Sequence, residues 1–200
     1  MGFTRLDTST PEQRRAVVEG RAQDPDRLAN HLLALVRSLE QVVDGHSVDM
    51  LTHSLQTATR AERAGADDDV VLAALCHDAG HLYSDDHHGR VAAEMLRGFV
   101  HPRTQWAIRV HRDFTTRYWV AGWAGRTPRL RHVAHPGYRL ARRFVDEWDQ
   151  TSFDPDYDHE PLEHFEPLLR RLLARPSFAR PTRVRRYLAG AARRLERRAG

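Results

Sequence analysis

The chain has 200 residues, a length that suits one globular domain, and 40% of them are hydrophobic. Its single cysteine, Cys76, excludes an internal disulfide and a cysteine cluster for a metal ion. All 31 basic residues are arginine, which excludes Schiff-base chemistry by lysine and a P-loop lysine. No apolar run approaches the roughly 18 residues of a membrane span, and the first residues lack a hydrophobic signal region. We therefore expect a cytoplasmic protein that does not enter a membrane.

Helical patterns follow one another along the chain. Helix-start signals at Thr10-Pro11 and Asp24-Pro25 predict two N-terminal helices, the second ending before Asp44-Gly45. Apolar residues at helical spacing predict further helices over residues 48–64, 70–77, 89–98, 102–111, 138–148, 162–174 and 182–198. No strand of period two and no internal repeat is evident. The sequence therefore predicts an all-α protein, a single-domain helical bundle.

The positive charge is concentrated at the C-terminal end. From Arg170 to Gly200 there are eleven Arg and one acidic residue, Glu196, whereas residues 1–169 carry 20 Arg and 26 acidic residues. We divide the chain into N-terminal helices that pack on the core (1–43), a metal-binding domain (44–169) and an Arg-rich helical extension (170–200). A helix that covers the bundle with a solvated basic face is the first interpretation of this extension. Binding of nucleic acid or of a partner protein is the second.

The dipeptide His77-Asp78 follows seven apolar or cysteine residues, Val70 to Cys76. A buried carboxylate is costly unless it meets a cation or a metal ion. Taken alone, the dipeptide fits equally well a helix end that reaches solvent, with His77 at the negative end of the helix dipole.

Four more residues on other predicted helices change this balance, because side chains from different helices can converge inside a bundle. They are His53, His88, His111 and Asp149. Four imidazoles and two carboxylates suit iron, manganese, cobalt or zinc, and they exceed the needs of one tetrahedral ion. Two ions that share Asp78 as a bridge account for the whole set. His87 adjoins His88 and could be the ligand instead, but the pattern of Val91, Ala92 and Leu96 favours His88.

The order of these residues resembles the HD superfamily. More narrowly, it resembles the HD-domain mixed-valent diiron oxygenases, which include phosphonate-cleaving oxygenases and, more distantly, myo-inositol oxygenase. The segments that carry the resemblance are LTHSLQTA (51–58), GADDDVVLAALCHDAGH (65–81), HGRVAAEML (88–96), VHRDFTTRY (110–118) and EWD (147–149). HD phosphohydrolases of the diadenosine-tetraphosphate type more often have lysine where this chain has His81.

The resemblance implies a division of the ligands between two irons. One iron would be held by His53, His77 and Asp149, the other by His88 and His111, with Asp78 as the bridge.

The resemblance also implies the residues that contact substrate. His81 would point at the substrate and its anionic group, and Arg117, one position later than the family's basic residue, would bind the same group. His46 occupies a substrate-contact position of the family, and Arg90 completes the predicted set.

Two departures from the family concern the substrate and not the metals. A Tyr-x-Gly-Glu lead-in is replaced by Val43-Asp44-Gly45-His46, and a Ser/Gln/Gly-rich segment before Asp149 is replaced by the shorter 119–130. We therefore expect an intact metal site, and a substrate other than 2-amino-1-hydroxyethylphosphonate. Trp119 and Trp123 in the shorter segment suit either a pocket wall or, as we expect, the core.

The function implied by the resemblance is that of a diiron oxygenase. An Fe(II)/Fe(III) pair would use O2 to cleave a C–P or C–C bond of a small hydroxylated anionic substrate. The alternative keeps the same ligands, with manganese or zinc in place of iron, and hydrolyses a phosphate ester or nucleotide.

Overall fold

The computed structural model describes residues 2–20, 24–119, 128–175 and 178, and helices make up its regular structure. No strand occurs in these ranges, so the prediction of an all-α bundle is confirmed. None of the helices in the described part of the chain has the length and hydrophobicity that crossing a bilayer would require. The predicted helix over 182–198 and Trp123 lie outside the described residues.

Helix α4 (Asp68–Cys76) forms the centre of the bundle. Its residues from Val70 to Cys76 are all buried, as expected of a helix that is apolar on every side. It packs between α3 (Met50–Arg63), α6 (Pro102–Trp119) and α8 (Leu162–Ala174). The residues that follow α4 therefore enter the interior of the bundle.

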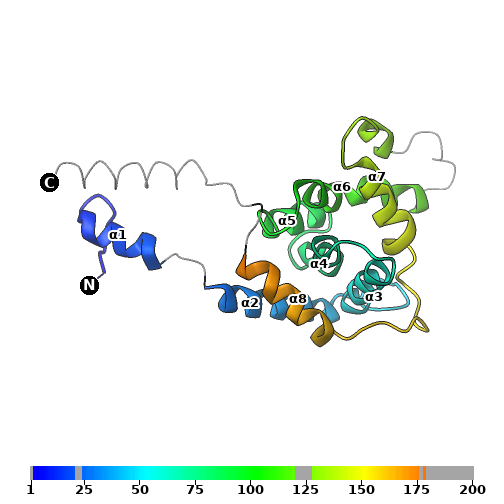
Figure 1. Ribbon diagram of the computed structural model, residues 1–200, viewed down its shortest axis with the longest axis horizontal. Coiled ribbons are helices and arrows are strands. Elements are labelled where there is room, and N and C mark those ends of the chain that lie inside the picture. The colour runs from blue at the N-terminus through cyan, green and yellow to red at the C-terminus, as the bar shows by residue number, and fades with distance from the viewer. Residues whose placement is uncertain (1, 21–23, 120–127, 176–177, 179–200) are drawn as a thin grey trace.

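The other helices pack around this centre in pairs (Figure 1). Helix α2 (Pro25–Arg37), capped by the Asp24 carboxylate, lies beside α8 and leads through the short helix η1 (Ser38–Gln41) toward α3. Helix α5 (His88–Met95) packs on α6, and α6 packs on α7 (Tyr138–Arg143). The short helices η2 (Ala79–Leu82) and η3 (Pro128–His132) contact α5 and α6, respectively.

Three elements differ from the sequence prediction. Helix α6 continues to Trp119, two turns past the predicted end at His111, because Phe114 is still buried on its inner face. The predicted helix over 138–148 changes after Arg143 into a π-helical segment, η4 (Phe144–Asp149). Helix η3 carries no apolar periodicity that could have predicted it, and none of its residues is buried.

Helix α1 (Pro11–Gly20) lies apart from the other helices in Figure 1, whereas α2 belongs to the bundle. The proposed boundaries at residues 43 and 169 stay predictions.

Gly80 allows η2 to approach the first residue of α5. A Cβ atom at position 80 would lie 2.2 Å from the carbonyl oxygen of His88 and 2.5 Å from its Cα, and backbone atoms cannot move aside as a flexible side chain can. We expect Gly80→Ala to lower the free energy of unfolding by about 3 kcal/mol, at the upper end of the usual cost of overpacking. For a chain of this size the Tm should fall by about 6–12 °C in thermal denaturation.

The control is Gly45→Asn. Gly45 has a φ of 80° and no atom within 4 Å of an added Cβ, and asparagine tolerates such a backbone. Its Tm should change by only a few degrees. Equal losses in the two variants would show that the contact between Gly80 and His88 is not the cause.

Candidate metal centre

Six buried side chains from five parts of the chain converge inside the bundle. They lie within α3, directly after α4, at the start of α5, within α6 and at the end of η4: His53, His77 with Asp78, His88, His111 and Asp149. Potential ligand atoms lie within 4.8 Å of one another in three groups that contain these residues: His53, His77 and Asp149; His77, Asp78 and His111; and Asp78 and His88 together with His81. The structure thus brings together the six residues that the sequence singled out.

Asp78 lies between two pairs of histidines. Its Oδ2 atom is 3.4 Å from Nε2 of His53 and 3.2 Å from Nε2 of His77. Its Oδ1 atom is 3.4 Å from Nε2 of both His88 and His111. Each carboxylate oxygen therefore faces one pair of imidazoles, which is the arrangement of a carboxylate that bridges two metal ions.

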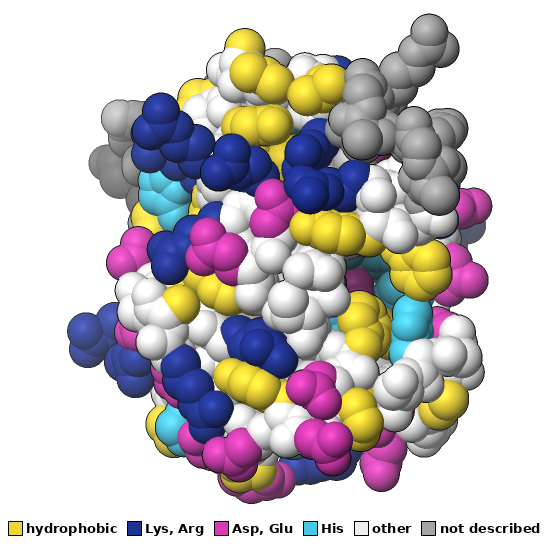
Figure 2. Space-filling view, turned by 90° about the vertical axis from the view of Figure 1, so that its right-hand side faces the viewer, with side chains coloured by type: hydrophobic (Ala, Val, Ile, Leu, Met, Phe, Trp, Pro, Cys, Tyr) yellow, Lys and Arg dark blue, Asp and Glu magenta, His cyan; other side chains and the backbone are white. Residues whose placement is uncertain are grey.

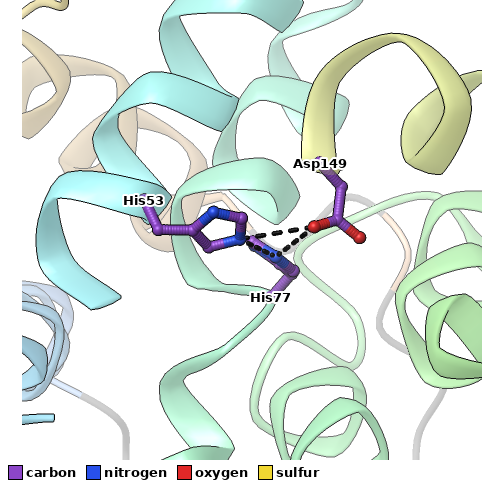
Figure 3. A group of neighbouring side chains, drawn as sticks. All are labelled: His53, His77 and Asp149. Carbon is purple, nitrogen blue, oxygen red and sulfur yellow. Dashed lines mark hydrogen bonds and ion pairs between the residues drawn. The ribbon is translucent and has the colours of Figure 1, made fainter. Parts of the chain in front are cut away.

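Asp149 adds a carboxylate to the first pair only. Its Oδ1 atom lies 3.3 Å from Nε2 of His53 and 3.7 Å from Nε2 of His77 (Figure 3). We call His53, His77 and Asp149 the first subsite, and His88 and His111 the second subsite.

All four imidazoles are oriented in the same way. Each Nδ1 hydrogen-bonds to a backbone carbonyl oxygen: His53 to Ser152 at 2.9 Å, His77 to Ala74 at 2.8 Å, His88 to Asp85 at 2.6 Å and His111 to Ile108 at 2.6 Å. Because a carbonyl only accepts, Nδ1 carries the proton in each ring, and Nε2 keeps a lone pair in the neutral form. Metal-binding histidines are commonly held in this way.

The same geometry brings the histidine Nε2 atoms and two carboxylate oxygens close together, and these atoms lack suitable bonding partners unless a cation joins them. Nε2 of His53 lies 3.2 Å from Nε2 of His77, and Nε2 of His88 lies 3.0 Å from Nε2 of His111. Asp78 Oδ1 and Asp149 Oδ2 are buried with no hydrogen-bond partner in the described structure. Ligands of one ion, at bonds of about 2.1 Å, lie about 3.0–3.4 Å apart. The residues therefore fit a pair of metal ions.

A cavity of about 770 Å³ opens next to the two subsites. Histidine side chains lie in a recess on the right-hand side of the face in Figure 2. Asp78, His88, His111 and Asp149 form part of the cavity wall, so both subsites can be reached from it.

Two of the four predicted substrate-binding residues line this cavity. The Nδ1 atom of His81 lies 3.2 Å from Asp85 Oδ1, and its Nε2 atom lies 3.7 Å from Asp78 Oδ1. His46 stacks on Phe153 with ring centroids 4.4 Å apart, and Phe153 stacks on the ring of His53.

The other two predicted residues are not among the described residues that line the cavity. Arg117 pairs with Asp146 at 3.4 Å, and Arg90 is exposed on α5. The arginine that does line the cavity is Arg112, next to His111 in the sequence, and it donates hydrogen bonds to the Asp85 carbonyl and the Asp86 carboxylate.

Residues 50–154 match the family model described as the HD domain. The chain belongs to the HD domain family. A search of curated proteins found no match. Membership of the HD family implies an enzyme that depends on divalent metal ions, a hydrolase or one of related activity. The matched range contains all six residues of the candidate HD metal centre.

Burial favours His88 over His87 as the metal-ligand candidate. His87 is exposed, and its Nδ1 atom interacts with the Asp86 carbonyl, whereas His88 is buried against His111. Trp119, which we expected in the core, instead lines the cavity with 68% of its surface exposed, because α6 carries it past the last buried turn.

Sequence reasoning missed several residues around the HD site. Asp85 lies one turn after His81, and Phe153 lies four residues after Asp149; both spacings are visible in the sequence. The Ser152 carbonyl that orients His53 left no signal, because any residue type supplies a backbone carbonyl.

Without metal, the two subsites of the HD centre differ in charge. Burial opposes ionisation of His77, but Asp78 and Asp149 outweigh it and raise its pKa well above the ordinary value. Burial also dominates at His88, where Asp78 does not compensate and the pKa falls to about 4. Without metal, His77 in the first subsite thus holds a proton at neutral pH, whereas His88 in the second subsite does not.

We expect metal binding at the first subsite to release this proton. A metal ion takes the lone pair of His77 Nε2, so metal affinity should rise by about tenfold per pH unit up to the raised pKa of His77 and level off above it. Calorimetric titration of the metal-free protein with Zn²⁺ between pH 6 and 8, in buffers of different ionisation enthalpy, measures the protons released.

The second subsite serves as the internal control. His88 is already neutral above pH 5, so its ion should bind with no proton release from this ring. A first-subsite affinity that is equal at pH 6 and pH 8 would contradict the assignment of the proton to His77.

Proposed function

We propose that this HD-domain protein is a mixed-valent diiron oxygenase that cleaves a C–P or C–C bond of a small hydroxylated anionic substrate. The observation that carries the proposal is the placement of four Nε2 atoms and two carboxylates around Asp78, whose two oxygens face different subsites. A donor set of imidazoles and carboxylates suits iron, and two buried subsites joined by a carboxylate suit a coupled pair. When bound, the two irons would supply chelation of the substrate and electrons for O2.

His81 would orient the substrate. The Asp85 carboxylate, 3.2 Å from Nδ1, favours the proton on that atom, so that Nε2 is directed toward Asp78 and the metal end of the cavity. There it can exchange a hydrogen bond or a proton with an oxygen of the substrate.

Arg112 would supply the positive charge for an anionic group at the cavity wall, in place of the predicted Arg117 and Arg90. Its guanidinium is already oriented by the Asp85 carbonyl at 2.7 Å and the Asp86 carboxylate at 3.0 Å. Guanidinium groups suit oxyanions because they donate two parallel hydrogen bonds.

Apolar side chains would limit the access of water to the reacting atoms. Met50 is buried beside the cavity, and Phe153 covers the face of the His53 ring at a centroid distance of 4.2 Å. A drier site strengthens the electrostatic contacts to substrate and protects reactive species from side reactions.

Hydrolysis of a phosphate ester or nucleotide is the second candidate, and the match to the HD family favours it. The same six ligands would hold two divalent ions such as Mn²⁺ or Zn²⁺, which stabilise the charge that develops on phosphate oxygens. The two candidates differ in metal, in the use of O2 and in product.

The test is anaerobic purification with metal analysis, followed by EPR after partial oxidation by air. About two irons per chain and a coupled mixed-valent signal are expected, followed by substrate-dependent O2 uptake in a screen of hydroxylated phosphonates and polyols. Zinc or manganese with phosphate release from phosphate esters, and no O2 uptake, would establish the hydrolase instead.

A further inference from the structure

The chain that follows Asp149 crosses α3 and is held there by side chains about one helical turn apart. The Nδ1 atom of His53 hydrogen-bonds to the carbonyl of Ser152 at 2.9 Å. Further along α3, the hydroxyl of Thr59 accepts a hydrogen bond from the backbone N–H of Glu160 at 3.0 Å. Gln56 lies between these two positions.

The amide of Gln56 fixes one peptide of this crossing. Gln56 is fully buried, and its Nε2 atom donates to the carbonyl of Asp154 at 2.6 Å. The N–H of Asp154 donates back to Oε1 of Gln56 at 3.3 Å. A side-chain amide that donates to and accepts from the same residue acts like a neighbouring strand, and it leaves that residue little freedom to shift.

The residues just before Asp154 orient the first subsite. The carbonyl of Ser152 holds Nδ1 of His53, and the ring of Phe153 stacks on the His53 ring with an angle of 15° between the planes. The N–H of Ser152 also donates to the carbonyl of Asp149 at 3.0 Å. One short segment therefore orients His53 and is bonded to the backbone of Asp149, and Gln56 anchors its far end.

The second subsite is held by other parts of the chain. His88 and His111 are oriented by the carbonyls of Asp85 and Ile108, in the loop before α5 and in α6. The two hydrogen bonds of the Gln56 side chain in the described structure both go to Asp154 and not to either histidine. A substitution of Gln56 should therefore alter the first subsite and leave the second subsite unchanged.

We propose that Gln56 is a positioning residue that sets the metal affinity of the first subsite, acting through Asp154, Ser152 and His53. The proposal rests on the dinuclear centre of the proposed function and not on which reaction that centre performs. Loss of such a supporting contact typically weakens metal binding about 10- to 100-fold.

The test is Gln56→Met in the full chain, which keeps the length of the side chain and removes both hydrogen bonds. Metal-free protein is titrated with Mn²⁺ and followed by EPR, since two neighbouring Mn²⁺ ions give a coupled spectrum and a single ion does not. One of the two Mn²⁺ sites of the variant should bind about 10- to 100-fold more weakly than in the wild type, and the other should keep its wild-type affinity. Between the two binding steps the variant should give an uncoupled spectrum.

Thr57→Val is the matched control. Thr57 is also fully buried on α3, but its hydroxyl donates its hydrogen bond to the carbonyl of His53 within the helix and not to the crossing segment. Its two Mn²⁺ affinities should stay as in the wild type, even if its Tm falls. If Gln56→Met does not fold, Gln56→Glu keeps Oε1 as an acceptor, removes the donor to Asp154, and should show the same selective loss.

Each result decides the proposal. Weakening of one Mn²⁺ site alone supports it, whereas equal weakening of both sites, or no weakening, overturns it and leaves Gln56 a structural residue. A wild-type protein that binds only one Mn²⁺ would instead contradict the dinuclear centre on which the proposed function depends.

Discussion

Asp78→Asn should deprive the protein of both metal ions and lower turnover at least about 1,000-fold, the equivalent of about 4 kcal/mol. The effect is large because the two oxygens of this carboxylate serve different subsites, at 3.2–3.4 Å from four imidazoles. Asparagine has almost the same shape, but it supplies no charge and presents N–H groups on one side. Metal content per chain after dialysis, measured together with turnover, checks this prediction.

Asp86→Asn is the control for Asp78→Asn. Asp86 is a carboxylate on the loop before α5 that pairs with Arg112 and is 83% exposed. The Asp86→Asn variant should keep both metal ions. Retention of two tightly bound ions by Asp78→Asn would rule out Asp78 as the bridge.

Removal of the metals should produce the largest change in stability. Four imidazoles and two carboxylates are buried close together, and without ions they retain unpaired atoms and a buried charge. An ion that is present at a thousand times its dissociation constant stabilises the folded state by about 4 kcal/mol. For a chain of this size, each ion should raise the Tm by about 8–16 °C.

Thermal denaturation of chelated and reconstituted protein measures this difference. The variant His53→Ala, His88→Ala, which loses a ligand from each subsite, should show little response to added metal. A Tm that is the same with and without metal in the wild type would mean that the six residues form a structural cluster.

The sequence was most informative where pattern and chemistry coincide. The apolar run before His77 predicted a central helix, and α4 is buried along that run. His77 and Asp78 drew attention because a buried carboxylate is costly without a cation, and the other four candidates were chosen by their places on different predicted helices and by the resemblance to the HD superfamily. Their common position beside Asp78 is the part that only the structure supplies.

The residues that line the cavity were harder to predict. Arg117 and Arg112 both follow His111 on α6, but a helix turns about 100° per residue. Arg117 stands one position after the family's basic residue, so it lies on a different face of α6 from that position. Arg112 lines the cavity, whereas Arg117 pairs with Asp146. The hydrogen bond of Gln56 could not be predicted from the sequence either, because its partner is the backbone of a segment that carries no periodic pattern.

The π-helical segment η4 makes the position of Asp149 depend on backbone conformation as well as on residue identity. The N–H of Gln150 bonds to the carbonyl of Val145, five residues back, so this turn contains one residue more than an α-helical turn. If the same residues formed an ordinary α-helix, the Asp149 carboxylate would lie about 100° further around the axis. The first subsite would then lose its own carboxylate although every ligand residue was still encoded.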